Sequence, residues 1–330
     1  MTWDGLEIDM LSLGNADSIL ITKWTNGDAE RVLVDGGRPE DAQTVKSFLD
    51  SQQVSRVDHL VCSHPDSDHV GGLVELVRGN SVCIGKGWVH QPDLHPGGKH
   101  LAELLRGQKL SETVGHLQKT FAQQDELVRT LRDKGVPVEE PFAGKRIGYV
   151  EVCGPSEQYY EQLLTDIKSI VEGDLNYYCV EKAGRKVWHD YGCDISVGRL
   201  LEGSTRPEND TSTVLLVADE AGKYLFTADA GVQAQKRATE YRDLSGCRWM
   251  QIPHHGSRYS CDPELVQYFR PKIAFVSAAG DCDHPSSEVI EAYEKAGATV
   301  YATYQAAPPG LHGYRGDVPP RDAPQSSTPL

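Results

Sequence analysis

Short apolar runs separated by turn residues fill the first sixty residues, a pattern typical of β-strands. The dipeptide Asn26-Gly27 lies between two of these runs and is a strong signal for a hairpin. Further along, apolar positions follow helical spacing in some stretches and form compact strand-like runs in others. The expected strands are Leu6–Leu13, Ser18–Trp24, Arg31–Val34 and Val57–Cys62, and the expected helices are Asp41–Leu49 and Leu73–Val77.

The middle of the chain, at about 85–207, has a weaker pattern. Leucines among many charges over Leu101–Lys134 predict one or two amphipathic helices. A strand at Gly148–Cys153 and a helix at Glu157–Val171 are expected next, while 172–207 is polar and aromatic with no clear period. We interpret this whole stretch as a partly helical insertion.

Regular alternation returns in the last third of the chain. Strands are expected at Thr213–Ala218, Lys223–Thr227, Arg248–Ile252, Ile273–Ser277 and Thr299–Thr303, and helices at Val232–Tyr241, Pro263–Phe269 and Ser286–Ala296. Both ordered halves begin with hairpin strands and continue with strands alternating with helices, which fits two packed sheets with helices outside. We expect one domain over 1–312 and a disordered Pro- and Ser-rich tail over 313–330.

Composition adds a constraint on partners. The chain has 330 residues, enough for a large buried core, and a formal net charge of −15 at pH 7. Such a surface repels phosphate backbones on average, so broad duplex binding is disfavoured. A cleft that holds cations reverses the sign locally, which leaves single strands or chain ends as possible substrates.

The sequence also predicts the compartment. No apolar run approaches the roughly 20 residues of a membrane-spanning helix, and the opening MTWDGLEIDM lacks the layout of a signal peptide. The eight cysteines are scattered without a CxxC pair, which favours buried, reduced thiols. We expect a cytoplasmic protein that does not contact membranes.

The sharpest chemical signal is a run of four metal-capable side chains directly after an expected strand: His64, Asp66, Asp68 and His69. In an extended segment the first three would point to one side, and a turn would be needed to bring His69 round. Imidazole mixed with carboxylate suits Zn²⁺, Mn²⁺ or Fe. The pair Gly71-Gly72 would then let the backbone pass close to the metals.

Three more motifs follow expected strands: Asp35 in a DGG turn, Asp229 in TADA, and His254-His255 before Gly256. Each alone has a plain structural explanation, as a turn, a helix cap or surface polar residues. Together they place acidic or histidine side chains at four strand ends, which is where sheet proteins build active sites. The spacing allows two metals with one carboxylate bridging them.

This set, DGG, HxDxDHxGG, TADA and HHGS, resembles the metallo-β-lactamase superfamily and, within it, the ComEC-type hydrolase domains of competence proteins. The likeness extends to Ile8-Asp9-Met10, to Asp17–Ile21, to Glu208–Val214 and to His284-Pro285-Ser286, and covers about 5–80 and 208–305. It implies a four-layer αββα sandwich of the α/β (or α+β) class with a metal-dependent hydrolytic site at one edge.

The resemblance also implies roles. His64 and Asp66 would hold one divalent metal ion, Zn or Mn, and Asp68 and His69 a second, with Asp229 as the bridge. One of His254 and His255 would complete the second site. We favour His255 as the ligand and His254 as a donor to a substrate oxyanion, with the reverse order open.

Three residues are given roles beside metal binding. Asp35 would orient a ligand histidine. Asp68 would orient a metal-bridged hydroxide or relay its proton. His284 is a candidate contact to the substrate, although a solvent-facing position before a helix explains it equally well.

The chain departs from the family pattern in three ways. Asp66 stands where histidine is commonest, although ComEC-like members often carry aspartate there. The separate mid-chain histidine of many members has no clear counterpart. The candidates are His90, His95, His100, His116 and His189, with His90 slightly preferred. Nor does the likeness include the membrane channel of ComEC, so DNA uptake is not implied.

Three functions remain open. The first is a phosphodiesterase or nuclease. The second is a hydrolase of small esters, lactones or amides, which predicts an apolar pocket built from aromatic residues of the insertion. The third is a partner-regulated or non-enzymatic role in which the insertion binds another protein. The aromatic residues in question are Trp88, Tyr159, Tyr160, Tyr177, Tyr178 and Trp188.

Overall fold

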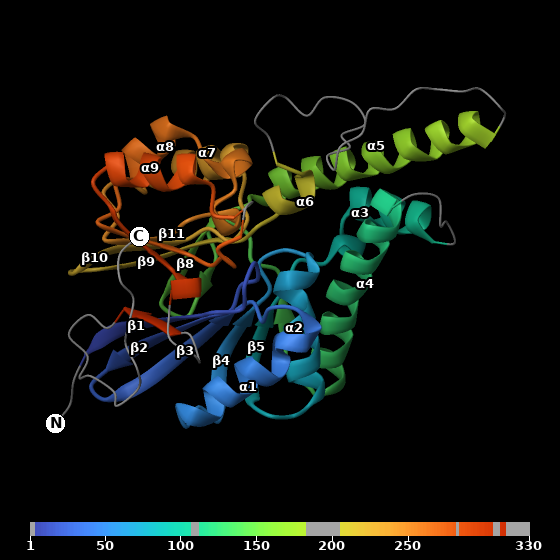
Figure 1. Ribbon diagram of the computed structural model, residues 1–330. Coiled ribbons are helices and arrows are strands. Elements are labelled where there is room, and N and C mark those ends of the chain that lie inside the picture. The colour runs from blue at the N-terminus through green and yellow to red at the C-terminus, as the bar shows by residue number, and fades with distance from the viewer. Residues whose placement is uncertain (1–3, 107–111, 183–204, 282–283, 306–310, 315–330) are drawn as a thin grey trace.

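Two facing β-sheets form the centre of the molecule (Figure 1). The computed structural model describes residues 4–106, 112–182, 205–281, 284–305 and 311–314. Within these residues one seven-stranded sheet has the order β14-β1-β2-β3-β4-β5-β6, and the other has the order β13-β12-β11-β10-β9-β8-β7. Helices cover the outer face of each sheet, so the expected αββα sandwich is confirmed.

The first sheet consists of β1 (Gly5–Leu11), β2 (Ile19–Thr25), β3 (Asp28–Val34), β4 (Arg56–Val61), β5 (Cys83–Trp88), β6 (Val138–Glu139) and β14 (Leu311–Tyr314). Strands β1 to β3 pair antiparallel and β3 to β6 pair parallel. Helices α1 (Ala42–Ser51) and α2 (Ser67–Arg78) connect the parallel strands. Leu20 and Leu33 of the sheet pack with Leu73 of α2 in a buried layer.

The second sheet consists of β7 (Arg146–Ile147), β8 (Val150–Gly154), β9 (Val214–Asp219), β10 (Gly222–Phe226), β11 (Trp249–Gln251), β12 (Ile273–Val276) and β13 (Thr299–Ala302). Strands β7 to β10 pair antiparallel and β10 to β13 pair parallel. Helices α7 (Val232–Tyr241), α8 (Pro263–Phe269) and α9 (Ser287–Lys295) cover its outer face. Each half therefore follows the scheme that the sequence predicts.

The inner faces of the two sheets meet in a third apolar layer. Ile8 and Ile21 come from the first sheet, and Phe226 and Trp249 come from the second, with the Phe226 and Trp249 ring centroids 5.0 Å apart. Because side chains alternate along a strand, neighbouring residues such as Leu20 face the outer helices instead. This layer fixes the two sheets, and hence the loops at their edges, relative to each other.

The insertion has a small core of its own. It contains α3 (Pro96–Leu105), α4 (Glu112–Asp133), α5 (Glu157–Lys182) and the short α6 (Pro207–Asp210). The prediction of one or two helices over 101–134 is confirmed as two, α3 and α4. Helix α5 extends beyond the expected end at residue 171 and projects from the body of the molecule (Figure 1). The core of the insertion includes Leu117 of α4 and Tyr160 of α5.

One expected boundary near the candidate motif is wrong. Helix α2 begins at Ser67 rather than at Leu73, so Asp68 and His69 lie in its first turn instead of in an extended segment. The apolar period starts only at Val70 because the first turn consists of polar site residues. The turn needed to bring His69 round is the start of this helix.

The expected start of the tail at residue 313 is also wrong. Strand β14 (Leu311–Tyr314) pairs antiparallel with β1, so residues 313 and 314, which we assigned to the tail, belong to the first sheet. Residues 315–330 lie outside the described part of the chain. Among the described cysteines, Cys62, Cys153 and Cys247 are buried free thiols, whereas Cys83 is exposed. In the described residues we find no helix whose length and apolar character would let it cross a bilayer.

Candidate metal centre

The loops that follow four strands bring the chemical motifs to one edge of the sandwich. Asp35 follows β3, and His64 follows β4 in the first sheet; Asp229 follows β10, and His255 follows β11 in the second. Three of these turns contain non-glycine residues with positive φ: Asp35 (58°), Ala228 (44°), and His254 and His255 (51° and 54°). Such left-handed backbone is unfavourable for most residues and gathers at functional sites.

Three buried histidines share one arrangement, in which Nδ1 is held by the protein and Nε2 is left without a hydrogen-bond partner. Nδ1 of His69 lies 2.9 Å from Asp35 Oδ2, Nδ1 of His255 lies 2.9 Å from the Ser277 carbonyl oxygen, and Nδ1 of His64 lies 3.0 Å from Ser63 Oγ. A carbonyl or carboxylate oxygen only accepts, so Nδ1 of His69 and of His255 carries the proton and Nε2 presents a lone pair. The Ser63 hydroxyl donates its proton to Asp35 Oδ2 at 2.6 Å, so its oxygen accepts from Nδ1 of His64, which gives that ring the same tautomer.

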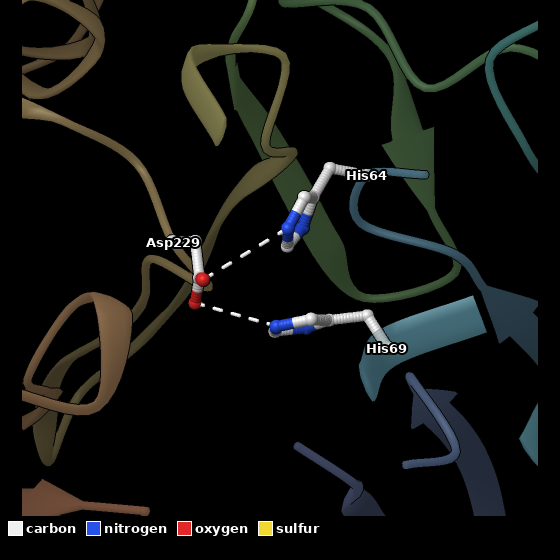
Figure 2. Close-up of side chains that lie close together, drawn as sticks. All are labelled: His64, His69 and Asp229. Atoms are coloured by element: carbon white, nitrogen blue, oxygen red, sulfur yellow. Dashed lines mark ion pairs between the residues drawn. The ribbon is translucent and has the colours of Figure 1, made fainter. Parts of the chain in front are cut away.

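These lone pairs converge on Asp229. Its carboxylate lies 3.4 Å from His69 Nε2, 3.8 Å from His255 Nε2 and 3.9 Å from His64 Nε2. Figure 2 shows His64 and His69 pointing at the two oxygens of this carboxylate. Ligands about 2.0–2.2 Å from a tetrahedral metal lie about 3.3–3.6 Å from one another. The spacing therefore fits side chains that share metal ions, with Asp229 between the two positions.

The buried carboxylates and histidines of this cluster also stabilise one another's charges. Burial opposes ionisation of Asp229, but His254 and His69 outweigh it and hold its pKa well below the usual value. Burial likewise opposes protonation of His69, yet Asp229 and Asp35 raise its pKa well above the usual value. The buried carboxylates thus favour positive charge at the rings of His69 and His255, and a divalent cation bound at their Nε2 atoms would supply it.

Asp35 has the orienting role that the resemblance implies. It is buried and accepts hydrogen bonds from the Ser63 backbone N–H at 2.8 Å and from Ser63 Oγ at 2.6 Å, in addition to the bond from His69 Nδ1. Three donors fix the carboxylate, and the carboxylate fixes the His69 ring. Such partners of a ligand histidine raise its basicity and set its tautomer.

Asp68 and Asp17 complete the second position. Asp68 Oδ2 lies 3.8 Å from His255 Nε2, and its side chain is 28% exposed, so it stands at the open side of the site. Asp17, which our sequence reasoning did not select, is buried with Oδ1 3.9 Å from His255 Nδ1. Burial raises its pKa, and Gln251 donates to its other oxygen at 2.7 Å. The only sequence signal for Asp17 was its place within the family likeness.

Asp66 and the mid-chain histidine, the predicted partners of His64 at the first metal position, do not lie where we expected them. Asp66 belongs to none of the metal-capable groups found among the described residues, and instead its Oδ1 lies 3.8 Å from Nε2 of His116. The slight preference for His90 as the mid-chain histidine is not supported. His90 stacks on Tyr160 with centroids 4.6 Å apart, and burial lowers its pKa to about 3.

The other mid-chain candidates fall elsewhere. His95 is buried and paired with Glu140 at 3.0 Å. His100 is exposed on α3, and His189 lies outside the described residues. Of the four candidates in the described residues, His116 is the one placed against a residue of the HxDxDH motif.

The geometry favours the expected order of the paired histidines. His255 belongs to two metal-capable groups, whereas His254 belongs to none among the described residues. The His254 ring is 23% exposed, with Nε2 3.6 Å from Asp229 Oδ2. His284 places its ring centroid 6.0 Å from that of His254 and 6.3 Å from that of His255, so it lies beside the site, and it belongs to none of the metal-capable groups of the described residues.

The two glycines of the motif have a role different from the expected one. A Cβ on Gly72 would lie 1.8 Å from the Gly36 carbonyl oxygen, and one on Gly71 would lie 2.4 Å from Pro39 Cδ. Gly72 N–H donates to the Gly37 carbonyl at 2.8 Å. The glycines let α2 touch the loop after β3, which sets Asp35 beside His69.

Comparison with protein families agrees with the fold and the site. Residues 11–280 match the model described as the metallo-beta-lactamase superfamily. The chain belongs to this superfamily. The buried histidine and aspartate clusters described above are consistent with a dinuclear metal site in this fold.

Distant homology to ComEC-type proteins is confirmed by curated relatives. ComE operon protein 3 of Bacillus subtilis is 19% identical over 320 residues, which cover 91% of this chain and 32% of that protein. Recombination protein 2 of Haemophilus influenzae is 27% identical over 207 residues, covering 63% of this chain and 23% of the relative. Uncharacterized protein YcaI of Escherichia coli is 31% identical over 115 residues, covering 34% and 15%. The chain thus matches 15% to 32% of the length of these relatives.

Proposed function

We propose that this protein is a divalent-metal-dependent hydrolase of phosphodiesters. The observation that carries the proposal is the convergence of three unpartnered, buried histidine Nε2 atoms on the carboxylate of Asp229. A buried nitrogen without a hydrogen-bond partner costs about 1–3 kcal/mol, and three around one carboxylate have a common explanation in bound metal. His64, His69, Asp229 and His255 would hold the ions, with Asp68 at the open side.

Divalent cations held there lower the pKa of water and stabilise negative charge on a reacting oxygen. Protein groups at the open side of the site would accept the proton and bind the substrate. Asp68 can accept the proton of the attacking water, because its carboxylate is partly exposed at 28%. Arg38 has Nη2 3.7 Å from Asp68 Oδ2 and brings a positive charge to the rim, where a phosphate would dock. His254 can donate a hydrogen bond to the substrate oxygen.

Two considerations favour phosphodiesters over small esters, lactones or amides. One of the relatives is named for recombination, a process of nucleic acids. The apolar pocket required by the alternative is also not supported by the aromatic residues that prompted it. Trp88 packs between the sheets, Tyr159 and Tyr160 are buried in helical cores, and the side chains at 177, 178 and 188 lie outside the described set.

The test is turnover of bis(p-nitrophenyl) phosphate by metal-free protein reloaded with Zn²⁺ or Mn²⁺. We expect hydrolysis that depends on the added metal and is abolished by Asp68→Ala, while His100→Ala, an exposed histidine of α3, behaves as wild type. Cleavage of lactones or amides without cleavage of the phosphodiester would overturn the substrate class. Failure to take up either metal would overturn the hydrolase proposal as a whole.

A second arm of the same experiment separates the paired histidines. His255→Ala is expected to lose bound metal, as measured by elemental analysis after gel filtration. His254→Ala should keep its metal and lose roughly 10²- to 10³-fold in turnover, because it removes a hydrogen-bond donor to a developing charge. Loss of metal from the His254 variant alone would reverse the assignment.

A further inference from the structure

A buried glutamine at the end of β11 joins the two halves of the metal centre. Gln251 is 2% exposed and is the last residue of β11, the strand that leads to His255. Its side-chain amide combines an NH₂ group that donates hydrogen bonds with an oxygen that accepts them. The oxygen is bonded within the second sheet, and the nitrogen is bonded to a residue of the first. Gln251 is therefore placed to fix one half of the centre against the other.

The oxygen of this amide holds the turn that presents Asp229. Oε1 of Gln251 accepts hydrogen bonds from the backbone N–H groups of Thr227 and Ala228, both at 3.1 Å. The backbone carbonyl of Gln251 accepts another from Thr227 Oγ1, also at 3.1 Å. Ala228 has a positive φ of 44°, which is unfavourable for a residue with a Cβ. Gln251 thus supports a strained turn directly before the carboxylate that lies between the two metal positions.

The nitrogen of the same amide reaches the first half of the centre through Asp17. Nε2 of Gln251 donates to Asp17 Oδ2 at 2.7 Å, and both side chains are buried. The backbone N–H of Asp17 donates to the Asp68 carbonyl at 3.2 Å, and its carbonyl accepts from Gly37 N–H at 2.8 Å. Asp17 is therefore bonded to the first turn of α2 and to the DGG turn, and Gln251 is bonded to Asp17.

Asp17 meets two of the histidine rings at their protonated nitrogens. Its Oδ2 lies 3.9 Å from Nδ1 of His69, and its Oδ1 lies 3.9 Å from Nδ1 of His255. These Nδ1 atoms donate to Asp35 and to Ser277, and the Nε2 atoms of the same rings are the ones near Asp229. Asp17 therefore completes the second position from behind the rings, as a negative charge beside two N–H groups.

The residue before Asp17 is bonded in the same way to the residue that holds His255. Ser277, directly after β12, donates through Oγ to the Ala16 carbonyl at 2.7 Å. The backbone carbonyl of Ser277 in turn accepts the bond from His255 Nδ1. Residues 16 and 17 of the loop between β1 and β2 thus contact both residues that position the second-sheet ligands. The positions of Asp229 and His255 are set against one short segment of the first sheet.

We propose that Gln251 is a positioning residue that lets Asp229 serve both metal ions, because its amide fixes the Asp229 turn to Asp17. The proposal rests on the metal site of the proposed function and adds to it the hydrogen-bonded link between its two halves. Without this link the sheets stay packed through their apolar layer, but the turn at Ala228 loses its support. The carboxylate of Asp229 would then follow one ion, and the other would be held more weakly.

The experiment measures how the two ions interact instead of turnover. Gln251→Met keeps the length of the side chain and removes both ends of the amide. Wild type and variant are stripped with chelator, reloaded with Mn²⁺ and examined by electron paramagnetic resonance. We expect two spin-coupled ions in wild type, as a shared carboxylate produces, and largely uncoupled ions in the variant. Competition with a chromogenic chelator should show the weaker ion bound about 10- to 100-fold less tightly in the variant.

The matched control is Gln124→Met, the same change at a buried glutamine of α4. It should match wild type in spin coupling and in metal affinity, because Gln124 does not belong to the link between the sheets. The unfolding temperatures of all metal-free proteins are measured alongside. A residue that only stabilises the fold would lower this temperature and leave the coupling of the loaded protein unchanged.

A second pair of variants tests the hydrogen bond at Asp17. Asp17→Asn keeps an oxygen that can accept from Gln251 Nε2, whereas Asp17→Ala removes it. We expect the spin coupling to survive in the Asn variant and to be lost in the Ala variant. Should Gln251→Met fail to fold, this pair decides the question.

Three results would overturn the inference and leave the proposed function standing. The first is wild-type coupling and affinity in Gln251→Met, the second is equal loss of coupling in the two Asp17 variants, and the third is a wild type that binds two uncoupled ions. A wild type that binds no metal would overturn both the inference and the proposed function.

Discussion

At the scale of single residues, the centre depends on which nitrogen of each histidine carries a proton. The oxygens of Asp35 and Ser277 hold Nδ1–H of His69 and His255, and so direct the free Nε2 toward Asp229. Holding Asp35 in this position strains the backbone, because Asp35 has a positive φ of 58°. The tautomers are therefore set by residues that need not touch the metal.

Asp35→Asn tests this arrangement. Asparagine tolerates positive φ and keeps one oxygen for the Ser63 N–H, but its amide group would face Ser63 Oγ and His69 Nδ1 as a donor. The His69 ring would then keep its proton on Nε2, so we expect metal affinity to fall about 10- to 100-fold with the fold intact. Competition with a chelator measures the change.

The control is Asp28→Asn, an exposed aspartate at the start of β3. It should bind metal as wild type does. Equal affinities for the two variants would mean that Asp35 does not set the His69 tautomer.

At the scale of elements, the contact between α2 and the loop after β3 decides where the ligands lie. Gly71 and Gly72 face Pro39 and Gly36 with no room for a side chain. The hydrogen bond from Gly36 N–H to the His69 carbonyl, 2.9 Å long, joins the same two segments. Close approach of α2 is thus a requirement of the centre and not only of the core.

Gly72→Ala should lose stability even without metal. Its Cβ would overlap a backbone oxygen at 1.8 Å, which only a shift of α2 can relieve, so we expect a loss of about 3 kcal/mol or more in the free energy of unfolding. Gly115→Ala, on α4 with no atom within 4 Å of its Cβ, should gain roughly 0.5–1 kcal/mol. Urea unfolding of the metal-free variants measures both, and a neutral Gly72→Ala would refute the packing argument.

The elements show what the sequence could and could not predict. The regular apolar spacing of α7 and of the strands was enough to predict the two halves of the fold and the order of their elements. Strands β6 and β7 have two residues each, too few for a period, and the first turn of α2 was hidden because its residues are polar. In each case tertiary packing, which has no local sequence signal, decides the boundary.

The same distinction applies to the centre. His64, His69, Asp229 and His255 could be predicted because each belongs to a compact motif at a strand end. Asp17 could not be assigned, since it lies in the loop between β1 and β2 and reaches the centre only when the two sheets pack together. Residues brought by long-range contacts need the fold before they can be recognised.

At the scale of the whole molecule, the formal net charge is −15, and only a few of its carboxylates belong to the metal centre. A substrate with many phosphates must approach this negative field, whereas a small monoanion meets it only at the rim. The Debye length shortens from about 30 Å at 0.01 M to about 8 Å at 0.15 M salt, so the repulsion is open to experiment.

We expect kcat/KM for a single-stranded oligonucleotide to rise several-fold as NaCl increases from 0.01 to 0.15 M, because screening removes repulsion. The value for bis(p-nitrophenyl) phosphate should change little over the same range. This direction is opposite to that of a protein with a basic nucleic-acid surface, whose binding weakens with salt. A fall in kcat/KM for the oligonucleotide would point to a basic docking face.

The pairing of β14 with β1 has a consequence for synthesis of the chain. β1 ends at Leu11 and its partner β14 begins at Leu311, so the ribosome makes nearly all of the described residues between the two strands. Until β14 is made, one side of β1 presents unpaired backbone N–H and C=O groups, the feature that makes strand edges prone to association with other chains. The nascent protein therefore carries an open edge while the residues between β1 and β14 are made, and it needs protection from aggregation until β14 pairs with β1.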